Sequence, residues 1–389
     1  MIRFFRPLCA LALLTSITLV LVGGCATAER PVQVRVGQTA DIPSTLCNGY
    51  FFVEANFEGH DFTLILDTGA EQTVLDTVSA FQAFPNRVTP TLLQAVSADG
   101  TRTTIDGTVR VRNVRLGPVD TGQVNALVLN LQPISDVLGT RIDGLIGWDV
   151  LKHLAVEMDY AGARVRVGPT GSLPISGGQK LSSGPLPVVS VDMPDGTRRF
   201  SIDTGSSGSF EMPTLDRVPL IDLPRVTGVA RSITGDTTTI GGRMDGTIRF
   251  AGTTYRYPLL ETSQGQARIG AGAFKTGTLY LDGPASTIAF RSRLGETFVQ
   301  RGERRLPIRI NREVPWTIAG GLDQSWLPRL GLEVGDEITA INGVDVEVFG
   351  CKSIAEIAGG ANEVTLTLLS NGSVREVRAP LIEMTPPAP

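Results

Sequence analysis

The chain alternates short apolar runs with turn signals along most of its length. From residue 50 to 167, and again from 188 to 290, runs rich in Val, Ile, Leu, Thr and Phe are separated by turns that contain Gly, Pro and Asp. Short runs with this punctuation indicate β-strands rather than helices. We therefore predict a mainly β protein in which residues 169–187, rich in Gly, Pro and Ser, link two β-rich parts.

One part of the β pattern occurs twice in the chain. Each copy has an Asp-Thr-Gly triplet after an apolar run, a triplet ending in Ile-Gly further on, and an Asp at the same spacing beyond it. These anchors are Asp67-Thr68-Gly69, Leu145-Ile146-Gly147 and Asp159 in one copy, and Asp203-Thr204-Gly205, Arg268-Ile269-Gly270 and Asp282 in the other. Anchors that recur in one order indicate an internal repeat. We predict two related lobes, residues 44–168 and 188–293.

The two Asp-Thr-Gly loops bring a pair of carboxyl groups with them. Small residues let such loops approach across a pseudo-two-fold axis, where each Thr hydroxyl can bond the opposite backbone. Two carboxylates that meet there share a proton, because both cannot readily be ionised. One then acts as a base toward water and the other as an acid toward a carbonyl. The predicted catalytic residues are Asp67 and Asp203. The loop-support residues are Thr68, Gly69, Thr204 and Gly205.

Three segments resemble motifs of retropepsin-like and pepsin-like aspartic proteases. They are residues 67–70, residues 203–206 and, most closely, the Asp-Gly-Leu-Ile-Gly-Trp-Asp-Val-Leu stretch at 143–151. The resemblance covers about residues 45–293. It implies an aspartic endopeptidase, active as a monomer on protein or peptide substrates, that needs no metal or organic cofactor.

The second lobe departs from this pattern at Arg268, where the first lobe has Leu145. Neither lobe shows the flap tyrosine of pepsins, so the expected flaps are two hairpins. The flap candidates are Asp99, Gly100, Gly235 and Asp236. Two flaps fit a retropepsin dimer fused into one chain. The alternative is that one lobe is degenerate, so that the enzyme is inactive or needs a partner.

Other polar residues near the motifs have simpler interpretations. We expect Asp149 to cap a short helix, and Asp159 and Asp282 to be turn residues. Ser206 lies in no Gly-x-Ser-x-Gly elbow, which argues against a serine hydrolase. Asp-Gly turns form readily, so two structural turns in a ligand-binding β protein remain an alternative to catalysis.

The first residues read as a targeting signal. Arg3 and Arg6 precede a predominantly apolar run, residues 8–22, which leads to Gly23-Gly24-Cys25. A basic start, a short apolar region and small residues before a cut are features of a secretory signal. Cys25 after Gly-Gly resembles a bacterial lipoprotein signal, so we expect residues 1–24 to be removed and residues 25–43 to form a tether. The resemblance implies a lipid on Cys25 and a periplasm-facing envelope location, and Ala26 favours the outer membrane.

Composition narrows the remaining options. The net charge of −4 gives no basic face for nucleic acid. Two histidines disfavour a zinc site built from His. After removal of the signal and lipidation of Cys25, the only free thiols left are those of Cys47 and Cys351, far apart in sequence. They could pair in an oxidising envelope, but two buried free thiols are the favoured interpretation.

Residues 303–383 form a third segment. Residues 330–344, Leu-Gly-Leu-Glu-Val-Gly-Asp-Glu-Ile-Thr-Ala-Ile-Asn-Gly-Val, resemble the core of bacterial PDZ domains. Asn342-Gly343 is a strong hairpin turn, residues 352–358 suit a short helix and residues 364–369 a strand. The resemblance implies a small α+β or β-barrel domain that binds peptide C-termini by strand addition. The alternative is a module that braces the second lobe.

The sequence therefore predicts an envelope aspartic endopeptidase with two protease-like β lobes and a PDZ-like domain. The alternative from another class is a non-catalytic peptide-binding or scaffold lipoprotein with a degenerate protease fold.

Overall fold

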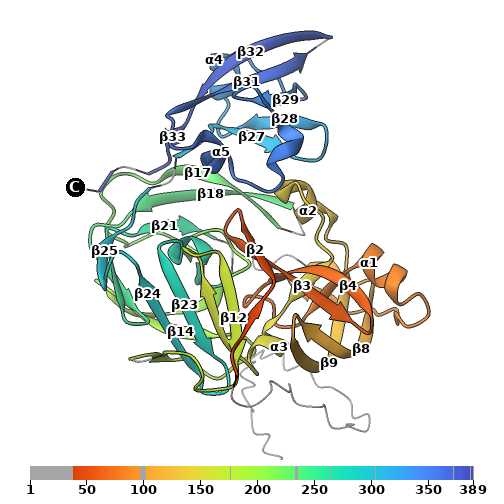
Figure 1. Ribbon diagram of the computed structural model, residues 1–389. Coiled ribbons are helices and arrows are strands. Elements are labelled where there is room, and N and C mark those ends of the chain that lie inside the picture. The colour runs from red at the N-terminus through yellow and green to blue at the C-terminus, as the bar shows by residue number, and fades with distance from the viewer. Residues whose placement is uncertain are drawn as a thin grey trace, which may run out of the picture. The chain divides into compact units, whose positions relative to one another are not determined.

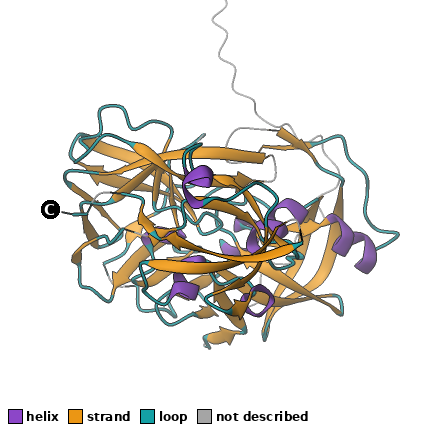
Figure 2. Ribbon diagram, turned by 90° about the horizontal axis from the view of Figure 1, so that it is seen from above, coloured by secondary structure: helices purple, strands orange, loops and turns teal. Residues whose placement is uncertain are grey.

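The computed structural model describes most of the chain from residue 38 onward (Figure 1). The described residues are 38–96, 102–175, 177–232, 235–263, 265–302, 304–370, 372–385 and 387–388. The predicted signal peptide, Cys25 and the flap candidates Asp99 and Gly100 lie outside them. Strands make up about half of the described part, and the helices between them are short (Figure 2).

The first lobe is built on a seven-stranded sheet with the order β2-β3-β4-β10-β5-β9-β8. β3 also pairs with β8, so the sheet closes on itself. Phe51, Val53, Ala55 and Phe57 alternate along β3 and are all buried, as the two-residue period of a strand requires. The elements are β2 (Ser44–Cys47), β3 (Tyr50–Phe57), β4 (His60–Leu66), β5 (Val74–Asp76), α1 (Thr77–Ala83), β6 (Gln94–Val96), β7 (Arg102–Thr104), β8 (Gly107–Leu116), β9 (Val119–Leu129), α2 (Gln132–Leu138), β10 (Gly144–Ile146) and α3 (Trp148–Leu151).

The second lobe is built on a ten-stranded sheet with the order β17-β18-β21-β16-β22-β15-β14-β19-β20-β25. Among its buried aromatic side chains, Phe210 and Tyr255 pack edge to face, with 5.0 Å between their ring centroids. The elements are β14 (Val188–Met193), β15 (Gly196–Asp203), β16 (Phe210–Met212), β17 (Arg225–Ser232), β18 (Gly235–Arg243), β19 (Thr247–Phe250), β20 (Thr253–Arg256), β21 (Leu259–Thr262), β22 (Arg268–Gly270), η1 (Ala271–Ala273) and β25 (Thr297–Val299).

The two lobes repeat one topology. The order β3-β4-β10-β5-β9 in the first lobe corresponds to β14-β15-β22-β16-β21 in the second. The senses also agree: β4–β10 and β15–β22 are parallel, and β10–β5 and β22–β16 are antiparallel. The next pairs, β5–β9 and β16–β21, are both parallel. The repeat predicted from the sequence anchors is therefore confirmed.

A six-stranded sheet joins the copies, in the order β1-β12-β11-β23-β24-β13. Its strands are β1 (Ala40–Ile42), β11 (Ala155–Asp159), β12 (Arg164–Gly168), β13 (Gln179–Lys180), β23 (Gly277–Asp282) and β24 (Thr287–Ser292). β11 and β23 are antiparallel, with Ala155 opposite Asp282 and Asp159 opposite Thr278. β1 and β13 come from the segments expected to be tether and linker. These segments were expected to be irregular, but each contributes a strand, because the edge of a sheet offers unpaired backbone N–H and C=O groups to a neighbouring segment.

The third segment has a sheet and a core of its own. The sheet order is β27-β28-β29-β31-β32, and its core includes Trp316, Ile338, Ile341 and Leu366. The elements are β26 (Arg304–Arg305), β27 (Ile308–Asn311), β28 (Trp316–Gly321), α4 (Trp326–Leu330), β29 (Glu337–Ile341), β30 (Val344–Asp345), η2 (Val346–Phe349), α5 (Ile354–Ala358), β31 (Glu363–Ser370), β32 (Ser373–Pro380) and β33 (Ile382–Glu383). The predicted turn, helix and strand are found here as the β29–β30 turn, α5 and β31.

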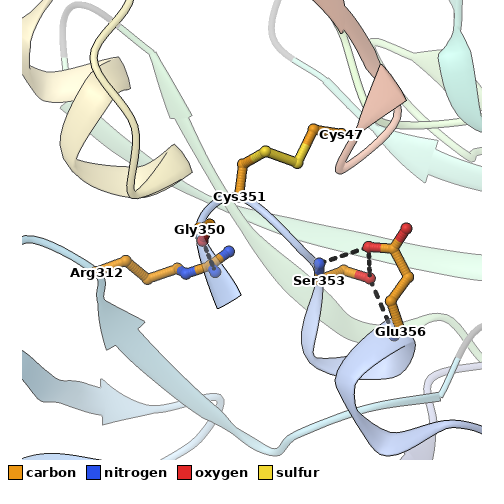
Figure 3. The surroundings of a disulfide bond; sticks show 6 residues. All are labelled: Cys47, Arg312, Gly350, Cys351, Ser353 and Glu356. Carbon is orange, nitrogen blue, oxygen red and sulfur yellow. Dashed lines mark hydrogen bonds between the residues drawn. A yellow bond between two sulfur atoms is a disulfide. The ribbon is translucent and has the colours of Figure 1, made fainter. Parts of the chain in front are cut away.

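A disulfide between Cys47 and Cys351 ties this C-terminal module to the first lobe (Figure 3). The interpretation of these residues as free thiols was therefore wrong. Cys47 ends β2, and Cys351 precedes α5, whose start is fixed by a capping box between Ser353 and Glu356 (Figure 3). The two Cα atoms are 5.7 Å apart despite a separation of 304 residues in sequence. Such proximity is set by tertiary packing, which the spacing does not reveal.

Within the part of the chain that the structure describes, no helix combines the length and the apolar character needed to span a membrane.

We predict that the disulfide makes a substantial contribution to stability. Replacing both Cys47 and Cys351 by Ser should lower the free energy of unfolding by about 2–4 kcal/mol, because the cross-link constrains the unfolded chain. Urea unfolding of the full-length chain in detergent measures this. A reductant should destabilise the wild type to the level of the double variant and leave that variant unchanged; equal stability of the two oxidised proteins would contradict the prediction.

Candidate active site

The two Asp-Thr-Gly segments lie at matched strand ends. β4 ends at Leu66, directly before Asp67, and β15 ends at Asp203. In each lobe the adjacent parallel strand, β10 or β22, belongs to the Ile-Gly triplet. The Asp67 N–H donates to the carbonyl oxygen of Ile146 at 3.0 Å, which fixes where the first loop begins.

Thr68 and Thr204 bind each other's loops crosswise. The Thr68 hydroxyl donates to the Ile202 carbonyl (2.8 Å) and accepts from the Thr204 N–H (3.1 Å). In the same way the Thr204 hydroxyl donates to the Leu66 carbonyl (2.8 Å) and accepts from the Thr68 N–H (3.1 Å). Both side chains are buried. Each hydroxyl thus bonds to the backbone of the opposite loop.

The two aspartates lie across the same junction. Asp67 Oδ1 accepts from the N–H groups of Gly69 (2.8 Å) and Ala70 (3.2 Å), and Asp203 Oδ1 accepts from Gly205 (3.0 Å). A Cβ atom on Gly69 would lie 2.4 Å from Asp203 Cγ, and one on Gly205 would lie 2.4 Å from Asp67 Cγ. Glycine at both positions is therefore what lets each carboxyl group pack on the opposite loop.

The two carboxyl groups interact as a buried pair. The side chains of Asp67 and Asp203 interact with each other, and a hydrogen bond between two carboxyl groups requires that one of them keeps its proton. Burial raises the pKa of Asp67 despite the loop N–H groups that oppose the rise. Burial, and next the charge of Asp67, raise the pKa of Asp203 to about 7, although Arg268 opposes this. The pair can thus hold one proton and one negative charge near neutral pH.

One ion pair beside the aspartates was not predicted. Arg268 on β22 bonds to Glu211 on β16, with Nε 2.7 Å from Glu211 Oε2, and its Nε lies 3.7 Å from Asp203 Oδ2. The Ser206 hydroxyl also donates to Glu211, so this serine serves the ion pair. The sequence marks Arg268, because this residue interrupts an otherwise apolar motif. It does not mark Glu211, which belongs to no motif.

Tyr50 is a further residue that the sequence analysis missed. Burial raises the pKa of its phenol, which is hydrogen-bonded to the side chain of Ser207 in the loop after Asp203. Tyr50 begins β3 in the first lobe and thus reaches the loop of the second. A lone tyrosine in a β pattern carries no signal for such a contact.

The structure corrects the role expected for Asp149. Gly147, not Asp149, is the N-cap residue of α3. Asp149 lies within the helix, and its Oδ1 accepts from the Thr73 N–H and hydroxyl, both at 2.9 Å. A Cβ on Gly147 would lie 2.5 Å from the Gln72 backbone, so close packing places a glycine at the cap. Burial raises the pKa of Asp149.

Asp159 and Asp282 are turn residues, as predicted. Asp159 accepts from the Gly162 N–H at 2.9 Å and Asp282 from the Ala285 N–H at 3.0 Å, each three residues on.

The strands that flank the flap candidates are paired, and the flap role remains a prediction. β6 pairs with β7, while Asp99 and Gly100 lie outside the described residues. Gly235 and Asp236 begin β18, opposite Ser232 and Arg231 of β17.

Among the described residues, no group of three or more His, Cys, Asp or Glu side chains is placed to hold a metal ion.

Comparison with known families identifies one similarity. The model of a family described as aspartyl protease matches residues 53–150, which include Asp67 and residues 143–150 of the stretch 143–151. No curated protein matches the chain. The match lies within the first lobe. The second lobe has the same strand order and is similar to the family in that respect. The predicted fold class is confirmed: the protein is mainly β, with aspartic-protease-like lobes.

We predict that the Thr204 hydroxyl stabilises the junction of the lobes. Thr204→Val keeps the shape but leaves the Leu66 carbonyl and the Thr68 N–H without this partner, so the free energy of unfolding should fall by about 2–3 kcal/mol. Thr204→Ser keeps the hydroxyl and serves as the matched control, with a loss below about 1 kcal/mol. Denaturant titration of the three proteins decides the point; equal losses for Val and Ser would contradict it.

Proposed function

We propose that the protein is an aspartic endopeptidase that hydrolyses peptide bonds with a water activated between Asp67 and Asp203. The observation that carries this proposal is the crosswise packing of the two carboxyl groups, each against the glycine of the opposite loop. The similarity of residues 53–150 to the aspartyl protease family supports it.

The chemistry follows from the shared proton. The ionised carboxylate accepts a proton from the water, which attacks the peptide carbonyl carbon. The protonated carboxyl group donates to the carbonyl oxygen and stabilises the tetrahedral intermediate. Proton transfer to the amine nitrogen then releases the two fragments. No covalent enzyme intermediate is needed, and the loop N–H groups on Asp67 and Asp203 hold the carboxylates in place throughout.

We propose that the C-terminal module is a PDZ-like domain that assists substrate or partner binding. β27 lies at an edge of its sheet, the position at which an extended peptide can add as a further strand. Bracing is the alternative role, and contacts with both lobes favour it. Cys351 is bonded to Cys47 in the first lobe, and Arg305 donates to the Thr227 carbonyl on β17 of the second at 3.5 Å.

We propose that the protein is a lipoprotein of the bacterial envelope, anchored through Cys25 and facing the periplasm, with the outer membrane favoured. The basic start and the apolar run at residues 8–22 support this. The Cys47–Cys351 disulfide adds support, because disulfides persist in oxidising compartments. Without Cys25 a lipid anchor could not form.

A non-catalytic peptide-binding or scaffold protein is the competing function. The observation that favours it is the asymmetry of the lobes, because Arg268 and Glu211 form an ion pair beside Asp203, whereas the matched positions of the first lobe hold Leu145 and Val74.

Cleavage assays distinguish catalysis from binding. The full-length chain should cut a denatured protein at acid to neutral pH, with activity falling as pH rises through about 7, where the pair loses its shared proton. Asp67→Asn and Asp203→Asn should each abolish cleavage, because either substitution removes one partner of the shared proton.

Mass spectrometry of the fragments provides the readout, and Asp149→Asn serves as a control that changes a partly buried carboxylate outside the pair. Activity that survives in either catalytic variant would contradict a shared pair. Folded wild-type protein that cleaves at no pH would shift the assignment to the binding protein.

Membrane fractionation tests the anchor. Wild-type protein should partition with membranes, whereas Cys25→Ala should be released to the soluble fraction. Replacing Ser16 by Ala within the same apolar run is the matched control and should leave partition unchanged. Unaltered membrane partition of Cys25→Ala would rule out the lipid as the anchor.

A further inference from the structure

The two lobes differ at one pair of cross-strand positions beside the aspartates. In the first lobe Leu145 on β10 lies opposite Val74 on β5. In the second lobe the matched positions are held by Arg268 on β22 and Glu211 on β16. An apolar pair in one copy of the repeat therefore corresponds to an ion pair in the other.

Glu211 is buried and Arg268 partly buried, and the ion pair lies beside the catalytic junction. The Arg268 and Glu211 side chains are 14% and 7% exposed, and Arg268 Nη2 lies 2.5 Å from Glu211 Oε2. Arg268 Nε is also 3.7 Å from Asp203 Oδ2. Glu211 is enclosed by the same loop, since a Cβ on Gly208 would lie 2.2 Å from its Oε1. The loop is thus shaped around this pair.

Stability alone does not explain the ion pair. Removing two charges from water is costly, and apolar residues of similar volume are often as stable or more so. The first lobe shows that this fold accepts such an apolar pair at the matched positions, where Val74 is buried. A charge pair in the second lobe therefore calls for another role, and the contact with Asp203 supplies one.

We propose that Arg268, held by Glu211, is a positioning residue that sets the pH range in which the catalytic pair retains a single proton. The inference rests on the proposed protease function. Arg268 lies on β22, the strand between β15, which carries Asp203, and β16, which carries Glu211. Of the two charges in the ion pair, the Arg268 guanidinium is therefore the nearer to Asp203. The pair as a whole thus favours the ionised form of Asp203. The negative charge of Glu211 limits this effect, because it offsets part of the attraction between Arg268 and Asp203.

The sign of the effect follows from the groups around Asp203. They are Asp67 from the first loop, Arg268 and Glu211 from the second lobe, Tyr50 from β3 and Tyr160 after β11. Arg268 is the cation in this set, and the others are neutral or negative. Removing its charge must raise the pH at which the pair ionises, and removing the Glu211 charge must lower it.

The test compares kcat/KM against pH for cleavage of one peptide by three full-length proteins. Glu211→Gln leaves Arg268 without its counter-charge, so both limbs of the bell-shaped profile should move to lower pH. The double variant Glu211→Val with Arg268→Leu copies the first lobe into the second, and both limbs should move up by about one pH unit. Opposite displacements are the expected result.

A matched control separates this role from a structural one. Glu157→Gln removes the carboxylate of another buried ion-pair group, bonded to Arg164 and Arg166 in the sheet that joins the lobes. The Glu157→Gln variant should have a lower melting temperature, while both limbs of its kcat/KM profile stay at the pH of the wild type. Limbs that stay in place in both Glu211 variants, whatever their stability, would overturn the proposal.

The pH dependence of thermal unfolding tests the placement without an activity. Asp203 has a raised pKa in the folded state, so stability should fall as pH rises from the ordinary Asp range toward about 7, and then level off. In Glu211→Gln the decrease in stability should end at a lower pH than in the wild type, and in the double variant at a higher pH. Each protein is compared with the same protein carrying Asp203→Asn, which removes the contribution of Asp203. A wild type that fails to cleave would overturn the protease function alone, whereas unfolding curves of identical pH dependence would overturn this inference.

Discussion

The crosswise hydrogen bonds of Thr68 and Thr204 are the constraint on which the candidate site depends. Each hydroxyl donates to a carbonyl of the other lobe and accepts one of its N–H groups, so neither loop can shift without leaving buried polar groups unpaired. Because each Thr directly follows an aspartate, these bonds also fix where the two carboxyl groups meet. The β11–β23 pairing is a second junction between the copies and restricts rotation of one lobe against the other.

Joining both lobes in one chain permits what a symmetric dimer cannot achieve. Two identical subunits must present the same residues on both sides of a two-fold axis. Here the backbone topology is repeated, while the side chains next to the aspartates have diverged, with Val74 and Leu145 on one side and Glu211 and Arg268 on the other. The chain thus keeps the geometry that symmetry provides and adjusts the charge on one side alone.

The sequence predicts those parts of the fold and site that depend on local or repeated pattern. The lobes follow from recurring anchors, and the loops of Asp67 and Asp203 from their triplets. The partners of those loops depend on strand register, so the contact between Arg268 and Glu211 was not predictable from spacing. The same holds for Cys47 and Cys351, which tertiary packing brings together across 304 residues. At Asp149 a local rule gave the wrong cap, because the backbone at Gln72 requires glycine at position 147.

The C-terminal module adds a third link between the lobes. Its disulfide holds β2 of the first lobe, and Arg305 contacts β17, a strand of the hairpin expected to act as the second flap. β26 and β33, at the two ends of the module, pair with each other. The disulfide and the Arg305 contact therefore belong to one compact unit with its own core. A hairpin that must open for a long substrate would therefore move against a module fixed to the opposite lobe. Bracing is not confined to Cys351 and Arg305, because β27 also contacts α2 of the first lobe. Strand addition at the edge of β27 would therefore take place beside a bracing contact.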